Sequence, residues 1–181
     1  MKRIIIFSII LPLLSWAFPV YGQTGKPKTA WANTKIPKGS TFHIKFDYGH
    51  TLFMGFSYDE YSRKDRDFQE GLIEAEGRFV ELFKELLWDN STTKKRVFNV
   101  TDKDEADYTL VVRPLEINDH GSVDGDIVIL DAAGRPVANL RNFVGSGGKY
   151  GSFTNLIGDG YESLAHEIVH EISLTIQAGT I

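Results

Sequence analysis

One segment of the sequence has the residue types and spacing of a catalytic metal centre. Residues 166–170 read His-Glu-Ile-Val-His and match the HExxH pattern. In that pattern two histidines one helical turn apart share a zinc ion, and the glutamate activates the metal-bound water. A third ligand is also needed, but Ser173 and Ile176 stand where the glycine and histidine of the longer zinc-protease pattern would follow. The remaining candidates lie upstream: His43, His50 and His120.

Helical periodicity favours a different interpretation of the same segment. At 100° per residue, His166 and His170 fall opposite the apolar stripe, on the side that faces solvent in a two-layer fold. The stripe itself consists of Tyr161, Leu164, Ala165, Ile168, Ile172 and Ile176. We therefore predict a polar helix face, with no catalytic residue, no metal site and no cofactor. The alternative function is a small zinc-dependent hydrolase in which Glu167 acts as the base.

A glycine-rich segment, residues 145–160, is the second candidate and is predicted to be a long loop. Its polar side chains are Lys149, Ser152, Asn155 and Asp159. A phosphate-binding P-loop is excluded because Tyr150 follows Lys149 where Ser or Thr is required. The loop could bind a ligand or a partner, since long loops are often functional. Alternatively, Asp159 caps the last helix and Glu162 completes a capping pair.

Clustered carboxylates give weaker signals. The group Asp102, Asp104, Glu105 and Asp107 departs from the order of an EF-hand calcium loop. The group Asp119, Asp124 and Asp126 could bind calcium at the mouth of a hairpin, although solvation of a turn explains it equally well. Asn90 and Asn99 begin glycosylation sequons, which matter only in a eukaryotic secretory pathway.

The N-terminus has the layout of a secretory signal peptide. A basic start, Lys2-Arg3, precedes an apolar run over residues 4–14, which is too short to cross a bilayer. We expect residues 1–22 to be removed, with cleavage after Gly22 preferred and after Ala17 second; an uncleaved anchor is the alternative. Cleavage would leave 18 basic and 24 acidic groups, so the net charge would change from −4 to −6. No later segment is apolar enough to span a membrane.

The amino-acid composition excludes several kinds of site and partner for the rest of the chain. The 181 residues contain no cysteine, which excludes disulfides, thiolate metal sites and cysteine nucleophiles. The acidic balance argues against binding nucleic acid through its phosphates. Residues 23–40 are polar and rich in turn formers, and are predicted to be a flexible leader before a single domain, residues 41–181.

Hydrophobic patterning within that domain predicts an α+β fold. Strands are expected over 41–47, 96–100, 107–117, 123–130 and 135–144, with a bulge or an edge position at Pro114. A capping box from Ser57 to Glu60 should start a helix that continues, with a bend before Asp67, to about Trp88. The last helix is expected over 161–176. These elements predict a two-layer sandwich: a mainly antiparallel sheet of about four strands with two helices on one face.

Several segments together resemble a family of uncharacterised secreted proteins from Bacteroides-type bacteria. They are residues 42–47, 54–60, 107–112, 147–153 and 158–160. The resemblance covers most of the chain after the signal peptide and implies an exported single domain without a known activity. At the level of fold, the element order is also similar to small periplasmic envelope domains such as the N-terminal domain of TolB.

The predicted function follows from these points. We expect an exported, non-enzymatic protein, periplasmic or secreted, that acts as a binding or envelope-associated module. An unknown protein or envelope partner would be bound through the glycine-rich segment or an exposed sheet edge.

Overall fold

The computed structural model describes residues 28–31, 36–37, 39–86, 99–102 and 105–178. The predicted signal peptide, Asn90 and Asp104 lie outside these residues. Within them, no helix is both long enough and apolar enough to cross a membrane. The described chain forms an α+β fold, as expected, with three helices and one sheet.

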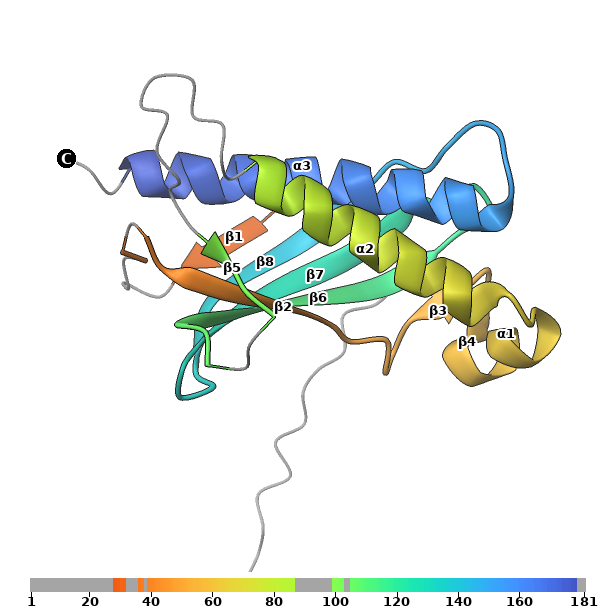
Figure 1. Cartoon of the computed structure of the whole chain (residues 1–181), viewed down its shortest axis with the longest axis horizontal. Coiled ribbons are helices and arrows are strands. Elements are labelled where there is room, and N and C mark those ends of the chain that lie inside the picture. The colour runs from red at the N-terminus through yellow and green to blue at the C-terminus, as the bar shows by residue number, and fades with distance from the viewer. Residues whose placement is uncertain (1–27, 32–35, 38, 87–98, 103–104, 179–181) are drawn as a thin grey trace, which may run out of the picture.

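The sheet has eight strands and is mixed, so the predicted sheet of about four mainly antiparallel strands was wrong in detail. The strands are β1 (Lys28–Trp31), β2 (Thr41–Phe46), β3 (Leu52–Phe53), β4 (Phe56–Ser57), β5 (Asn99–Val100), β6 (Tyr108–Ile117), β7 (Val123–Asp131) and β8 (Pro136–Gly145). Their main order is β1-β8-β7-β6-β2-β5, with β3 beside β6 and β4 beside β3 (Figure 1). Within the segment predicted to be a flexible leader, β1 pairs with β8.

Parallel pairing occurs between β2 and its two neighbours, β6 and β5, and also between β3 and β6. The chain leaves β2, passes through the helical segment and returns to β6 in the same direction. Asp107 fixes this register, because its carboxylate accepts hydrogen bonds from the Thr41 amide and hydroxyl, each at 2.8 Å. These bonds also lower the pKa of Asp107. Periodicity along a strand shows which face is buried but cannot show the direction of its neighbour.

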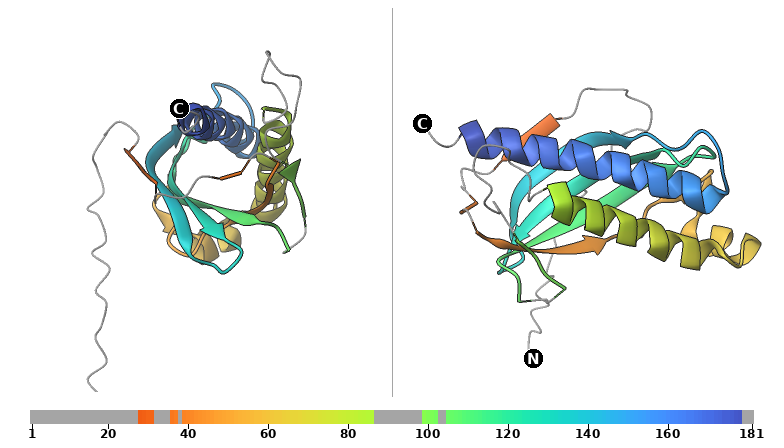
Figure 2. Two further views of the ribbon diagram at one scale, coloured as in Figure 1. Left: turned by 90° about the vertical axis from the view of Figure 1, so that its left-hand side faces the viewer. Right: turned by 45° about the horizontal axis from the view of Figure 1, so that its top comes forward.

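Two helices cover one face of the sheet. They are α2 (Phe68–Leu86) and α3 (Phe153–Ala178), which lie side by side over the strands (Figure 2). The shorter α1 (Tyr58–Lys64) precedes α2 and begins with the predicted capping box. The core between the layers includes Phe42, Phe53, Phe79, Phe83, Leu110, Ile127, Leu140, Phe143, Tyr161 and Leu164.

The last helix begins at Phe153, eight residues before its predicted start, so the predicted loop over 145–160 was too long. Ser152 starts the helix, since its hydroxyl accepts a hydrogen bond from the Asn155 amide at 3.4 Å. Asp159 therefore lies inside α3 and is not a cap. The glycines of this segment reflect close packing: a Cβ on Gly160 would overlap the carbonyl oxygen of Gly121.

Predictions for the long strands were accurate. Pro114 lies next to a register shift between β6 and β7, which is the predicted bulge. Gly125 stands opposite Pro114, where a Cβ would come within 2.6 Å of the Arg113 carbonyl oxygen. The turn between β7 and β8 uses Gly134 at φ +75°.

The β3–β4 hairpin carries local backbone strain that the sequence did not indicate. Met54 has φ +50° and Gly55 has φ +83°. Two consecutive positive φ values are typical of a type I′ turn, for which Asn-Gly is the preferred pair. A methionine in this conformation is unfavourable because its Cβ crowds the following carbonyl group.

Met54 also packs against the hydrophobic core, so Met54→Asn is compared with Met54→Ala, which likewise removes those contacts. The Asn variant should be the more stable by about 1 kcal/mol, because asparagine adopts positive φ more readily than alanine. Urea unfolding of the two proteins measures the difference. The matched control is Gly55→Ala, which places a Cβ at positive φ and should lower stability. A Met54→Asn protein that is less stable than Met54→Ala would contradict the assigned turn.

Candidate functional site

The HExxH residues lie on the outer surface of α3. His166, Glu167 and His170 are exposed, whereas the neighbouring Ala165, Ile168 and Val169 are buried. This agrees with the face predicted from helical periodicity. Among the described residues, no three His, Asp or Glu side chains gather as a metal-binding group.

The upstream histidines are dispersed over other elements. His43 lies in β2, where its Nδ1 is 3.2 Å from the Thr101 carbonyl oxygen. His120 is exposed in the turn between β6 and β7, and its amide donates to the Asn118 side chain at 3.0 Å. His50 follows β2 and lines a pocket. The described residues therefore do not assemble the three-ligand centre that the hydrolase alternative requires.

The predicted acidic groups have structural partners. The Asp126 carboxylate accepts a hydrogen bond from the Asn142 amide at 3.1 Å, and Asn142 has φ +61° at an irregularity between β7 and β8. Partial burial raises the pKa of Asp124 in the same hairpin. Asp107 binds Thr41, as described above. We find no basis in these contacts for a calcium site.

The polar residues of the glycine-rich segment are also separated. Lys149 and Tyr150 are exposed in the remaining loop, with 90% of Tyr150 accessible. Asn155 and Asp159 belong to α3, and Ser152 caps it. The segment predicted as one loop over 145–160 is therefore divided between a shorter loop and the first turns of α3.

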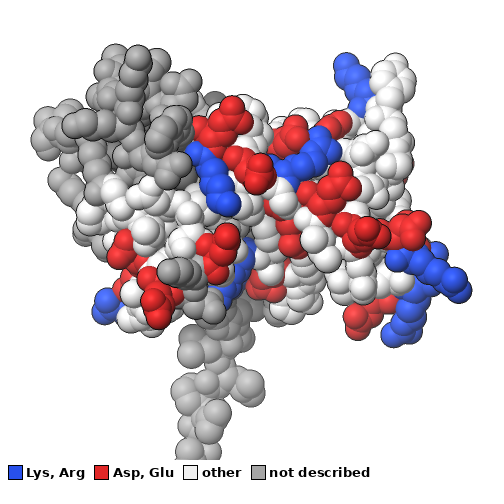
Figure 3. Space-filling view, viewed as in Figure 1, with Lys and Arg blue, Asp and Glu red and all other residues white. Residues whose placement is uncertain are grey.

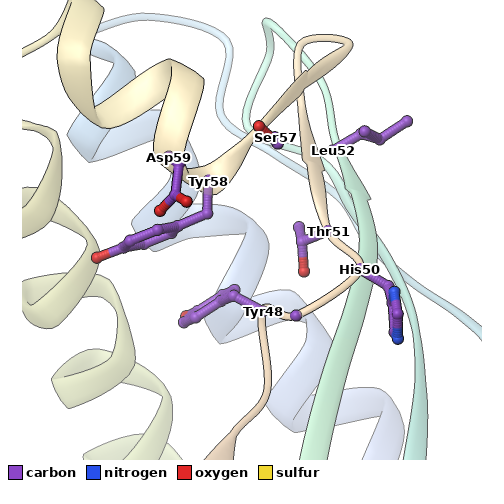
Figure 4. Close-up of a pocket in the computed structure, with 8 residues that line it drawn as sticks. Tyr48, His50, Thr51, Leu52, Ser57, Tyr58 and Asp59 are labelled. Atoms are coloured by element: carbon purple, nitrogen blue, oxygen red, sulfur yellow. The ribbon is translucent and has the colours of Figure 1, made fainter.

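An open pocket lies where the chain passes from β2 to α1. Its volume is about 590 Å³, and its lining residues are Tyr48, Gly49, His50, Thr51, Leu52, Ser57, Tyr58 and Asp59. Tyr48, Tyr58 and Asp59 point to one side of the linking segment, and His50 and Leu52 point to the other (Figure 4).

The aromatic wall of this pocket is formed by Tyr48 and Tyr58. Their rings stack with centroids 6.0 Å apart and planes inclined by 19°. Behind them, Tyr58 also contacts Phe53 and Phe68. Thr51 holds the linking segment against the sheet, because its buried hydroxyl donates to the Pro114 carbonyl oxygen at 2.6 Å. The wall is therefore positioned by contacts on both sides.

A partly buried hydrogen-bond chain continues inward from Tyr48. The Tyr48 and Tyr161 hydroxyl oxygens are 2.9 Å apart, and Tyr48 also bonds the Glu76 carboxyl group. Either hydroxyl group can donate in the Tyr48–Tyr161 bond. When Glu76 is ionised it can only accept, so the hydroxyl proton of Tyr48 then goes to Glu76 and Tyr161 donates to Tyr48. The chain thus joins α2, the pocket wall and α3.

The surroundings of this chain shift the pKa values of its members. Burial raises the pKa of Tyr161 far above its ordinary value, and Tyr161 is fully inaccessible. Burial, followed by the proximity of Tyr161 and Glu76, likewise raises the pKa of Tyr48. Burial raises the pKa of Glu76, and the bond from Tyr48 partly offsets it. Perturbed groups beside a pocket mark candidate functional sites.

Glu76→Gln should remove one pH-dependent contribution to stability. The protonated carboxyl is favoured in the fold, so its contribution is complete below the ordinary pKa of 4.5. It is lost as the pH rises through the raised pKa of the folded state. Urea unfolding between about pH 4 and pH 7 should therefore show stability falling more with rising pH in the wild type than in Glu76→Gln. Parallel curves for the two proteins would contradict the raised pKa.

An ion-pair cluster fixes α2 against α3 near this chain. Arg78 of α2 donates to Asp159 at 2.8 Å and to Glu162 at 2.7 Å, both on α3. Gly158 makes room for the guanidinium group, since a Cβ there would overlap it. Asp159 and Glu162, predicted as a possible capping pair, thus act together as acceptors for Arg78. Figure 3 shows many other carboxylates over these helices.

Sequence reasoning missed the Glu76–Tyr48–Tyr161 chain. Tyr161 was predicted to lie on an apolar stripe, and Tyr48 falls just after the strand predicted over 41–47. The residue in the sequence that could have indicated this chain is Glu76. It follows Ala75 and lies one helical turn after Leu72, on the apolar side of α2. An acid at that position requires a buried partner.

Comparison with known proteins identifies no family. No known family description and no curated protein matches the sequence. Among solved structures, the PelC dodecamer from Paraburkholderia phytofirmans is 11% identical in sequence and has a TM-score of 0.44. The match covers 80% of this chain and 96% of the PelC chain. A DUF330 protein from Xanthomonas campestris is 9% identical in sequence and has a TM-score of 0.38; the match covers 83% of this chain and 89% of that protein's chain. These distant likenesses carry no argument about function.

Proposed function

We propose that this protein is an exported, non-enzymatic binding module and that the pocket beside Tyr48 and Tyr58 is its ligand site. The observation that carries this proposal is the aromatic wall. Its two rings, Tyr48 and Tyr58, stack on each other, and the Tyr48 hydroxyl is held by the hydrogen-bond chain to Glu76 and Tyr161. Binding sites gain affinity when their contact groups are ordered before the ligand arrives.

The lining suggests the class of ligand. Aromatic rings present a flat apolar surface, and the nearby Asp59 supplies a carboxylate. The Ser57 hydroxyl also lines the pocket but is engaged with Glu60 in the capping box. A small compound, or a side chain of a partner, that combines a ring with hydrogen-bond donors would match this surface. The open shape of the pocket fits a group presented from solvent.

Export is part of the same proposal and rests on the basic start and apolar run of residues 1–22. Expression of the full chain in a Gram-negative host should yield a mature protein in the periplasmic fraction. N-terminal sequencing is expected to begin at Gln23, or at Phe18 if cleavage follows Ala17. A cytoplasmic protein that retains Met1 would contradict export. It would not affect the proposed ligand binding, which is tested by a separate experiment.

Ligand binding is tested by NMR of the tyrosine rings. Phenol, benzyl alcohol, glucose and N-acetylglucosamine serve as probes of ring and hydroxyl recognition. Binding at the proposed site should shift the ring signals of Tyr48 and Tyr58. Tyr150, which lies in the loop after β8, is the internal control and should not move.

A further inference from the structure

The outward face of α3 carries the one pair of histidines in the sequence that are four residues apart, His166 and His170. Both are exposed, and the intervening Ile168 and Val169 are buried against the rest of the protein. The helix is thereby held in one orientation, with both imidazoles on its solvent side. Side chains at this spacing are neighbours, with Cβ atoms about 5–6 Å apart.

We propose that His166 and His170 form a two-imidazole binding site for a divalent transition-metal ion, with Cu²⁺ preferred over Ni²⁺ and Zn²⁺. Imidazole nitrogens bind such ions at about 2.0–2.1 Å, so two neighbouring rings on one helical turn can share one ion. The preference follows from the general order of affinity among these metals, which peaks at copper. Water completes the coordination.

Charge around the pair favours a cation. The helix α3 contains no Lys or Arg, and its acidic residues include Glu162, Glu167 and Glu171. Glu162 lies one turn before His166 and is engaged by Arg78, whereas Glu167 is exposed between the histidines. Nearby carboxylates raise the local concentration of cations.

This site is distinct from the zinc-hydrolase centre considered from the sequence. That centre requires three protein ligands, and the described residues supply no such group around the pair. It is also independent of the proposed ligand pocket, whose lining contains neither histidine. The inference therefore concerns metal binding, with no reaction attached to it.

Isothermal titration of tag-free, metal-stripped protein with CuCl₂ tests the proposal. The wild type should bind one ion, and both His166→Ala and His170→Ala should weaken binding by at least about tenfold through loss of a ligand. His120→Ala is the matched control, since it removes an exposed histidine outside α3 and should leave affinity unchanged. Thermal unfolding without metal confirms that the surface variants remain folded.

Electron paramagnetic resonance of the copper complex provides a second readout. Two coordinated imidazole nitrogens are expected in the wild type, and one in each single variant of the pair. Copper binding that is unchanged in His166→Ala and His170→Ala would overturn the proposal. So would the absence of binding at millimolar CuCl₂, or an equal loss of affinity in His120→Ala.

Discussion

Gly160→Ala is expected to destabilise the protein by about 3 kcal/mol, the upper part of the usual range for overpacking. The new Cβ would overlap the carbonyl oxygen of Gly121 and approach the Val123 side chain at 3.1 Å. The first of these obstacles is backbone, which cannot move aside as a flexible side chain can. Helix propensity alone would favour alanine by about 1 kcal/mol, so the expected sign depends on this close approach.

Gly77→Ala is the matched control for that prediction. Gly77 also lies inside a helix, α2, but a Cβ there meets nothing within 4 Å. Its replacement should stabilise the protein by up to about 1 kcal/mol. Urea unfolding of both variants measures the two effects. If Gly160→Ala and Gly77→Ala changed stability equally, close packing would not explain the glycines of α3.

Tyr48→Phe is expected to cost about 2 kcal/mol, because it leaves the buried Tyr161 and the half-buried Glu76 without their partner. Tyr161 would lose the oxygen to which it donates, and Glu76 would lose a donor. Tyr161 is completely inaccessible, so water cannot replace the missing bond. This prediction depends on the direction of the hydrogen-bond chain and therefore tests it.

Tyr161→Phe is the matched comparison. It removes only the terminal donor, leaves the bond from Tyr48 to Glu76 intact, and should cost about 1 kcal/mol. The double variant should cost less than the sum of the single changes, since no tyrosine hydroxyl is then left unpaired. Unfolding free energies of the three variants decide the matter: a larger loss for Tyr161→Phe than for Tyr48→Phe would reverse the assigned direction.

Local signals in the sequence were sufficient for several elements. The Ser57–Glu60 capping box marked the start of α1, and alternation of apolar residues located β2, β6, β7 and β8 closely. These features depend on contacts between residues near one another in the chain. The exposure of His166 and His170 could be predicted for the same reason, because the period of a helix determines which residues share a face.

Features that depend on distant parts of the chain could not be predicted in this way. Gly158 and Gly160 suggested a loop, because glycine weakens an isolated helix. In the fold they allow α3 to approach Arg78 and Gly121, and neither contact can be inferred from spacing. The same reason applies to the short strands β3 and β4 and to the parallel pairing of β2, because these also depend on contacts between distant parts of the chain.

The candidate site was missed for a related reason. Its hydrogen-bond chain joins Tyr48 to Tyr161 across 113 positions of sequence and to Glu76 on a separate helix. The HExxH and glycine-rich segments could be identified as candidate sites because their residues are contiguous in the sequence. Contiguous residues are easily recognised, but here they lie on a helix surface and at a packing interface.

NMR of the tyrosine rings with the four small probes tests the central claim, ligand binding beside Tyr48 and Tyr58, most directly. The account predicts saturable shifts at both rings for at least one probe, with Tyr150 unchanged. Saturable shifts confined to other parts of the protein, or no saturable shift at Tyr48 and Tyr58 with any probe, would contradict it.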